Sequence, residues 1–188
     1  MIVVLALGLA LGIQAWLIKP YQIPSGSMEP TLDVGQRVLV NRFVYHFGDP
    51  SVGDIVVFHP PAGAEDQPPT CGAPHGANQA CPKATDEESG ENFIKRIVAG
   101  PGDTLAVHDG HPVVNGVEKT DEPYILPCGS TSVCNLPKPI TIPPDYYFMM
   151  GDHRGESDDS RYWGPISRDW IIGKAFATYW PLDRVGIF

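Results

Sequence analysis

Positive charge is scarce in this sequence. Its 188 residues include 13 Lys and Arg against 22 Asp and Glu, a formal net charge of −9, and no stripe of basic residues offsets the deficit. The composition therefore argues against a nucleic-acid-binding protein, and we predict no nucleic acid among its partners. Long amphipathic helical patterns are absent after the first 20 residues, and no internal repeat is present. These absences argue against a helical bundle.

Glycine and proline, in contrast, are abundant, at 20 residues each, and 43% of the residues are hydrophobic. That is enough apolar material for one domain with a core, and the many turn formers predict a loop-rich body. Short runs rich in β-branched and aromatic residues predict strands at residues 36–45, 54–58, 92–99, 105–107, 112–117, 145–150 and 170–180. The dipeptide Asp109-Gly110 predicts a hairpin turn. We expect a mostly β domain over residues 20–188.

Two segments of the predicted domain lack this strand pattern. Residues 60–91 are poor in large apolar side chains and rich in Pro, Gly, Ala and acidic residues, which predicts a flexible acidic insertion. Residues 118–143 form a second, proline-rich segment, which we interpret as another irregular insertion.

One long apolar run opens the chain, and residues 1–18 contain Gln14 as the only strongly polar side chain. As a helix of ~1.5 Å rise per residue this run spans about 27 Å, close to the ~30 Å hydrocarbon core of a bilayer. A cleaved signal peptide is disfavoured because no basic residue precedes Lys19, and a buried core helix because the run has no polar face. We predict a transmembrane anchor over residues 1–19.

Four cysteines occur as two local pairs, Cys71 with Cys81 and Cys128 with Cys134. Outside the cytoplasm this predicts two disulfides, for which three connectivities are formally possible. We favour the local pairings because short loops are easiest to close in turns rich in Pro and Gly. The alternative is a zinc site formed by Cys71, His75 and Cys81. It lacks the usual Cys-x-x-Cys spacing, so we predict no metal.

A candidate nucleophile follows the apolar run, in the stretch PSGSMEPTL at residues 24–32. Pro24 and Pro30 restrict the backbone at its two ends, and Gly26 permits conformations closed to other residues. The hydroxyl of Ser27 would then be held in one orientation. Ser, Gly and Pro also form ordinary turns, so the stretch by itself decides nothing.

A candidate base lies in the predicted strand at residues 92–99. Strand side chains alternate between two faces, so one of Lys95 and Arg96 points toward whichever face is buried. In a thin domain both would simply extend to solvent. A desolvated lysine, however, has a lowered pKa and can accept a proton, which arginine cannot. Lys95 and Ser27 would then form a Ser–Lys nucleophilic pair. The competing base is His153, next to Asp152, in a Ser-His-Asp triad, although the serine lacks a Gly-x-Ser-x-Gly setting.

Four stretches resemble, in the same order, the sequence boxes of bacterial type I signal peptidases. They are SGSMEPTL at residues 25–32, GDIVVF at 53–58, KRIVAGPGD at 95–103, and the segment from GDHR to SDDSR at 151–161. The resemblance implies an antiparallel β-sheet domain of the signal peptidase type behind one N-terminal transmembrane helix. It further implies a membrane-anchored serine endopeptidase that removes signal peptides from secreted preproteins.

The resemblance also implies roles for individual residues. Ser27 would be the nucleophile and Lys95 the general base, with an oxyanion hole formed by the backbone N–H of Ser27 and the hydroxyl of Ser25. No cofactor is implied. His153 departs from the family, which usually has Asn there, and the resemblance supplies no role for residues 60–91.

Further residues are implied around this pair. Ser157 would orient the Lys95 amine, Asp159 would pair with Arg161, and Arg96 would be a structural neighbour of the base. The pairing of Asp159 matters because a free carboxylate against Lys95 would stabilise the ammonium form. Met28 and Pro24 would border the substrate pocket.

The resemblance implies secretory preproteins and the lipid bilayer as partners, and a single-pass protein of the cell membrane with its catalytic domain on the extracytoplasmic side. About nine residues separate residue 18 from the candidate nucleophile, a reach of ~30 Å at most, so the site would lie near the membrane. Two alternatives remain at this point. One is a soluble self-cleaving repressor, which would carry a DNA-binding region, and the other is a non-catalytic, membrane-anchored β-domain that binds exported proteins.

Overall fold

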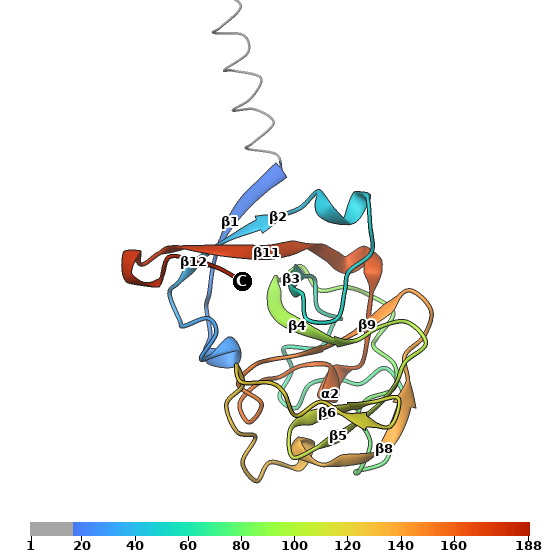
Figure 1. The fold of residues 1–188 in the computed structure, drawn as a ribbon. Helices are drawn as coiled ribbons and strands as arrows, with labels where there is room; N and C mark the ends of the chain where they lie inside the picture. The colour runs from blue at the N-terminus through green and yellow to red at the C-terminus, as the bar shows by residue number, and fades with distance from the viewer. Residues whose placement is uncertain (1–16) are drawn as a thin grey trace, which may run out of the picture.

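The computed structural model describes residues 17–188, which form two antiparallel β-sheets (Figure 1). The larger sheet has the order β1-β2-β11-β3-β4-β9-β10, with β12 paired to β11. Its strands are β1 (Ile18–Gln22), β2 (Arg37–Asn41), β3 (Ile55–Phe58), β4 (Phe93–Ala99), β9 (Tyr146–Met150), β10 (Ile166–Ser167), β11 (Ile171–Trp180) and β12 (Gly186–Ile187). The prediction of a mostly β, antiparallel domain is confirmed.

The smaller sheet has the order β7-β6-β5-β8. Its strands are β5 (Thr104–His108), β6 (His111–Val114), β7 (Val117–Glu118) and β8 (Leu136–Thr141). After β1, helical structure is limited to short segments, namely α2 (Ser160–Trp163) and the 3₁₀ turns Gly26–Met28, Val44–His46, Ser132–Cys134, Arg168–Trp170 and Leu182–Arg184. The predicted hairpin is present, since Asp109 and Gly110 both adopt positive φ between β5 and β6.

The core is organised around β3, which lies between β11 and β4 and is buried on both faces. Ile55 and Val57 pack into one apolar cluster, and Val56 and Phe58 pack into another on the opposite side. This explains why the strand reads as a continuous apolar run rather than an alternating one. β4 pairs along β3, so its middle residues are carried into the interior.

β8 corrects the interpretation of residues 118–143 as irregular throughout. The strand was missed because its sequence contains Pro137 and Pro139, which cannot donate backbone hydrogen bonds. It is the edge strand of its sheet, with β5 as its one neighbouring strand and a single bridge from Lys138 to Gln79 on the other side, and proline is tolerated at such a position. Leu136 and Ile140 point from β8 into a third apolar cluster.

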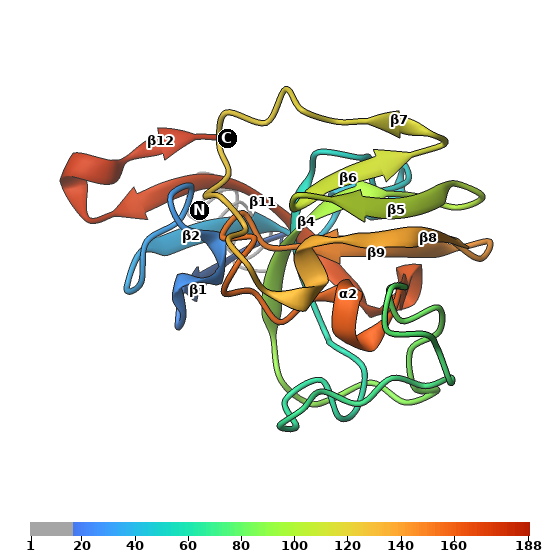
Figure 2. The same cartoon turned by 90° about the horizontal axis from the view of Figure 1, so that it is seen from below.

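The segment of residues 60–91 packs against the body of the domain (Figure 2). Ala64 belongs to the same apolar cluster as Phe58 and Trp163, and the N–H of Cys81 donates to the carbonyl oxygen of Arg161 at 3.1 Å. Its two ends are joined by a hydrogen bond from the N–H of Ala62 to the carbonyl oxygen of Glu87. The predicted flexibility of this segment stays a prediction.

The predicted anchor at residues 1–19 lies almost wholly outside the described residues. Where the structure does describe it, Ile18 and Lys19 are in β1, paired with Asn41 and Val40 of β2. The boundary of the predicted anchor therefore ran into the first strand. Among residues 17–188, no helix has the length and apolar character needed to cross a membrane.

Candidate active site

Ser27 is held in the one-turn 3₁₀ segment Gly26–Met28 that follows β1. The next residue, Met28, is fully buried and packs with Leu32 in an apolar cluster, and this anchors the turn to the core. The carbonyl oxygen of Ser27 also accepts a hydrogen bond from the N–H of His153 at 3.1 Å. Ser27 itself is only 8% exposed, so the nucleophile candidate has a fixed position at the edge of the core.

Lys95 lies in the middle of β4, opposite Val56 of β3, and is 5% exposed. Its Nζ is 2.7 Å from the Oγ of Ser27, within hydrogen-bond distance, although 68 residues separate the two in sequence. The amine is also 5.4 Å from the centre of the Phe93 ring. The two side chains singled out in the sequence are therefore in contact in a largely dry environment.

Burial is the largest influence on this amine and lowers the pKa of Lys95 to about 8. Asp159 and Asp158 oppose burial by raising the pKa, while Arg161 lowers it. With this pKa roughly a tenth of the amine is unprotonated at pH 7, against well under a thousandth for an ordinary lysine, and that fraction can accept a proton.

The Asp159–Arg161 pair lies next to the amine and is completely buried. Arg161 Nε and Nη2 donate to the two oxygens of Asp159 at 2.7 and 2.8 Å, and the N–H of Gly151 donates to the same carboxylate at 3.0 Å. Burial alone would raise the pKa of Asp159, but the contacts with Arg161 and Gly151 outweigh it and hold the pKa below its ordinary value. Because its oxygens are already occupied, this carboxylate does not clasp Lys95.

Ser157 and Ser25 differ in their contacts with Ser27 and Lys95. The Ser157 hydroxyl is buried, and within residues 17–188 it has no hydrogen-bond partner, so the predicted contact with the Lys95 amine is not formed here. The Ser25 hydroxyl donates to Ser27 Oγ at 3.4 Å, which places it beside the candidate nucleophile. The roles of both residues stay predictions.

A second ion pair lies on the other face of β4. Arg96 donates to Asp152 through Nε at 2.9 Å and Nη2 at 2.6 Å, and Asp152 also accepts from the hydroxyl of Thr31 at 2.5 Å. The guanidinium carbon of Arg96 lies 4.0 Å from the centre of the Tyr124 ring. Neither the spacing nor the type of Thr31 and Tyr124 predicted their contacts, which are with Asp152 and Arg96 respectively.

His153 does not form the alternative triad. In the part of the chain that the structure describes, no hydrogen bond joins its ring to Ser27, and its buried Nδ1 has no hydrogen-bond partner. Its contribution is through the backbone, where it donates to the Ser27 carbonyl.

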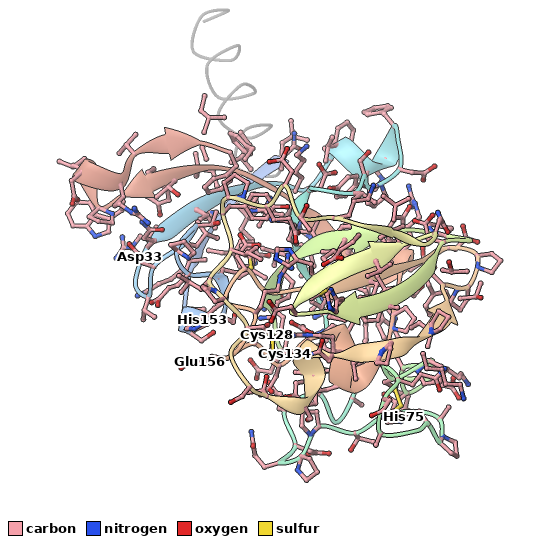
Figure 3. All side chains as sticks on the ribbon, turned by 60° about the horizontal axis from the view of Figure 1, so that its bottom comes forward. Asp33, His75, Cys128, Cys134, His153 and Glu156 are labelled. Atoms are coloured by element: carbon pink, nitrogen blue, oxygen red, sulfur yellow. A yellow bond between two sulfur atoms is a disulfide. The ribbon has the colours of Figure 1, made fainter. Side chains whose placement is uncertain are left out.

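Two disulfides join Cys71 to Cys81 and Cys128 to Cys134. The first uses both cysteines of the alternative zinc site, so no thiolates remain there for a metal. The second lies near the Asp159–Arg161 pair, since Arg161 Nη1 is 3.7 Å from Cys128 Sγ. Figure 3 labels this second pair.

A cleft of ≈ 420 Å³ opens over Ser27 and Lys95. Its lining includes Pro24, Ser25 and Gly26, which precede the nucleophile candidate, and Phe93 and Ile94 of β4. The remaining lining residues are Asn92, Glu65, Glu91, Glu156 and Asp158. Met28 was expected at this pocket, but it is fully buried beneath the turn because it anchors that turn in the core.

A serine hydroxyl in contact with a buried amine of lowered pKa, at the floor of a cleft, is the arrangement of a serine hydrolase with a lysine base. Comparison with known proteins identifies the family. A family model described as signal peptidase, peptidase S26, matches residues 1–180. The chain therefore belongs to the type I signal peptidases, a family of serine peptidases, as the resemblance of its four sequence boxes predicted.

Individual relatives agree with this assignment. A probable signal peptidase I-2 from Synechocystis sp. is 36% identical over 98% of this chain and 73% of its own length. A signal peptidase I from Leptolyngbya laminosa is 36% identical over 97% of this chain and 78% of its own length. A crystal structure of a signal peptidase I from Enterococcus faecalis V583 matches 67% of this chain and 96% of that chain, with 22% identity and a TM-score of 0.40, too low to carry weight for the fold.

Proposed function

We propose that this protein is a membrane-anchored serine endopeptidase that removes signal peptides from secreted preproteins, with Ser27 as nucleophile and Lys95 as general base. The observation that carries the proposal is the 2.7 Å separation of Ser27 Oγ and Lys95 Nζ, together with the burial that lowers the pKa of the amine to about 8. The relatives named signal peptidase I support the substrate class.

The reaction proceeds through an acyl-enzyme. Lys95 Nζ takes the proton of Ser27 Oγ as that oxygen attacks the carbonyl carbon of the scissile bond, and it then gives the proton to the leaving amine. A water molecule next attacks the acyl-enzyme, with Lys95 again accepting a proton, and Ser27 is regenerated. The developing oxyanion is stabilised by the N–H of Ser27 and the hydroxyl of Ser25, which lies within 3.4 Å of the nucleophile.

The substrate enters the cleft as an extended strand, with its backbone paired to the cleft walls. Pro24 and the residues Phe93 and Ile94 offer apolar surface there. A hollow of ≈ 20 Å³ lined by Ile23, Val57 and Ile94, among others, adjoins the cleft. A hollow this small has room only for a small side chain, which supports cleavage after residues such as Ala.

The apolar run that precedes β1 serves as the membrane anchor in this proposal, with the chain from β1 onward as the extracytoplasmic catalytic domain. The supporting observations are the length of the run and the two disulfides, which form in oxidising compartments. Because β1 begins at Ile18, the catalytic domain starts directly after the anchor.

The test is preprotein processing by the full chain in detergent or vesicles. Ser27→Ala, Lys95→Ala and Lys95→Arg are each expected to abolish the appearance of a shortened product, since arginine stays protonated and cannot act as a base. The exposed Ser130→Ala and Lys138→Arg serve as matched controls and should leave processing unchanged. Processing by any of the three variants at the wild-type rate would refute the dyad. Binding of preprotein without cleavage by the wild type would favour the non-catalytic alternative.

A further inference from the structure

The mouth of the active-site cleft is lined by carboxylates. Glu65, Glu91, Glu156 and Asp158 all line it, and all four are exposed. The only cation among the lining residues is Lys95, which lies buried at the floor. With the amine unprotonated, as the reaction requires, the formal charge of the cleft lining is −4.

The four carboxylates, here called the acidic rim, come from three separate parts of the chain. Glu65 belongs to the segment of residues 60–91, Glu91 lies just before β4, and Glu156 and Asp158 follow β9. Figure 3 shows Glu156 at the surface, close to His153. Glu65 is positioned by its neighbour Ala64, which is 2% exposed and packs in the cluster that contains Trp163. The segment to which the family resemblance gives no role thus contributes a wall of the cleft.

The charge of the acidic rim is hardly neutralised by the protein itself. Within residues 17–188, Glu65, Glu91 and Asp158 have no cationic side chain within 4.0 Å. Glu156 faces only His153, whose Nδ1 is 3.9 Å from one of its oxygens. A carboxylate that is left without a protein partner interacts with whatever charged group enters the cleft.

We propose that the acidic rim makes this peptidase selective for substrates that carry Lys or Arg close to the scissile bond, and selective against those that carry Asp or Glu there. The inference rests on the proposed function, because the occupant of the cleft is taken to be the peptide that Ser27 attacks. A basic side chain beside the bond is attracted to several carboxylates at once, while an acidic one is repelled by them. Residues 60–91 thereby act as a specificity element through Glu65 and Glu91.

The size of the effect follows from the exposure of the rim. One exposed carboxylate changes the preference for a nearby Lys over a Glu by about twofold at low salt. Several carboxylates acting on a change from Glu to Lys predict a preference of about tenfold in kcat/KM. Because the Debye length falls to about 3 Å at 1 M salt, the preference should largely disappear there.

The experiment compares six peptides with the full-length enzyme. Each contains the same Ala-x-Ala cleavage sequence, with Lys, Gln or Glu placed either between the two alanines or at the second residue after the cut. The expected order of kcat/KM is Lys above Gln above Glu at one or both positions, with a Lys-to-Glu ratio above threefold at low salt. A ratio below threefold at both positions overturns the proposal.

Two variants assign the effect to the rim. Glu65→Gln and Glu91→Gln are each expected to lower the Lys-to-Glu ratio by about twofold. The matched control is Glu88→Gln, which removes a carboxylate from the same segment. Glu88 does not line the cleft but lines a different hollow, beside Arg168. A ratio that falls equally in all three variants overturns the proposal, since it would reflect net charge alone. Failure of the wild type to cleave any peptide would instead refute the proposed function.

Discussion

The lowered pKa of Lys95 leads to a prediction about the substitution of Asp158. Burial lowers the pKa of this amine to about 8, and Asp158 is among the groups that raise it. In the proposed mechanism the unprotonated amine is the active form, so kcat/KM should rise with pH and reach half of its plateau near pH 8. Replacing Asp158 by Asn removes a charge that favours the ammonium. The rising limb of the profile should therefore move to lower pH.

The magnitude follows from the exposure of Asp158. Interactions between exposed charges are typically worth about 0.2–1 kcal/mol, and 1.36 kcal/mol corresponds to one pH unit. The midpoint of the profile in Asp158→Asn is thus expected to fall by about 0.2–0.7 of a pH unit. At pH 6.5, well below the midpoint, this raises kcat/KM by about 1.5- to 5-fold, while the plateau above pH 9 changes little.

The assay is the pH dependence of kcat/KM for an uncharged peptide substrate, so that the acidic rim does not act on the substrate. Asp169→Asn is the control, because Asp169 is also exposed but lies at the hollow beside Arg168 rather than at the cleft. An unchanged midpoint in Asp158→Asn, or an equal shift in Asp169→Asn, would show that the rate does not report the amine. A shift to higher pH would contradict the sign of the electrostatic effect.

Two further predictions concern the loss of stability caused by burying Lys95 and the tight packing around Gly151. Lys95→Met should be inactive but more stable, by about 3 kcal/mol in the free energy of unfolding at pH 7, because the fold no longer lowers the pKa of an amine from ~10.4 to about 8. Denaturation at several pH values should show the full difference in the free energy of unfolding between variant and wild type below pH 8, and the loss of that difference as the pH rises toward ~10.4. Equal stability of the two proteins at pH 7 would contradict this prediction. Gly151→Ala should reduce kcat/KM by about 100-fold in a folded protein, since a methyl group there would overlap the Ser157 hydroxyl and the Ser27 carbonyl. Gly100→Ala, where the nearest atom is 3.8 Å away, is its control, and equal activity of the two variants would be evidence against the tight packing at Gly151.

Most of the strands could be predicted from the sequence because their patterns are local. The predicted run at residues 54–58 corresponds to β3 (Ile55–Phe58), and the run at 145–150 to β9 (Tyr146–Met150). β1 could not be predicted because it follows the apolar run without a break, and its pairing with β2 is decided by tertiary contacts. β8 was obscured by its prolines, which only its place at a sheet edge makes acceptable.

For the site, the sequence indicated the kinds of residue but not all of their contacts. The chemistry of a dry lysine near a serine pointed to Lys95 and Ser27, whose contact depends on how β4 and the turn after β1 meet. The position of Glu65 could not be predicted, because it depends on how residues 60–91 pack against α2. In a segment without a strand pattern, the sequence does not indicate which part of the domain a charged residue will lie against.

The order of strands in the larger sheet has a consequence for the synthesis of this protein. β11, near the end of the chain, lies between β2 and β3, which come from its first third. Ser27 lies in the turn after β1, and Lys95 lies in β4, so β11 joins the part of the sheet next to Ser27 to the part that carries Lys95. A growing polypeptide in which both residues have already been made still lacks β11. We therefore expect proteolytic competence to arise only once β11 has been made and has paired with β2 and β3.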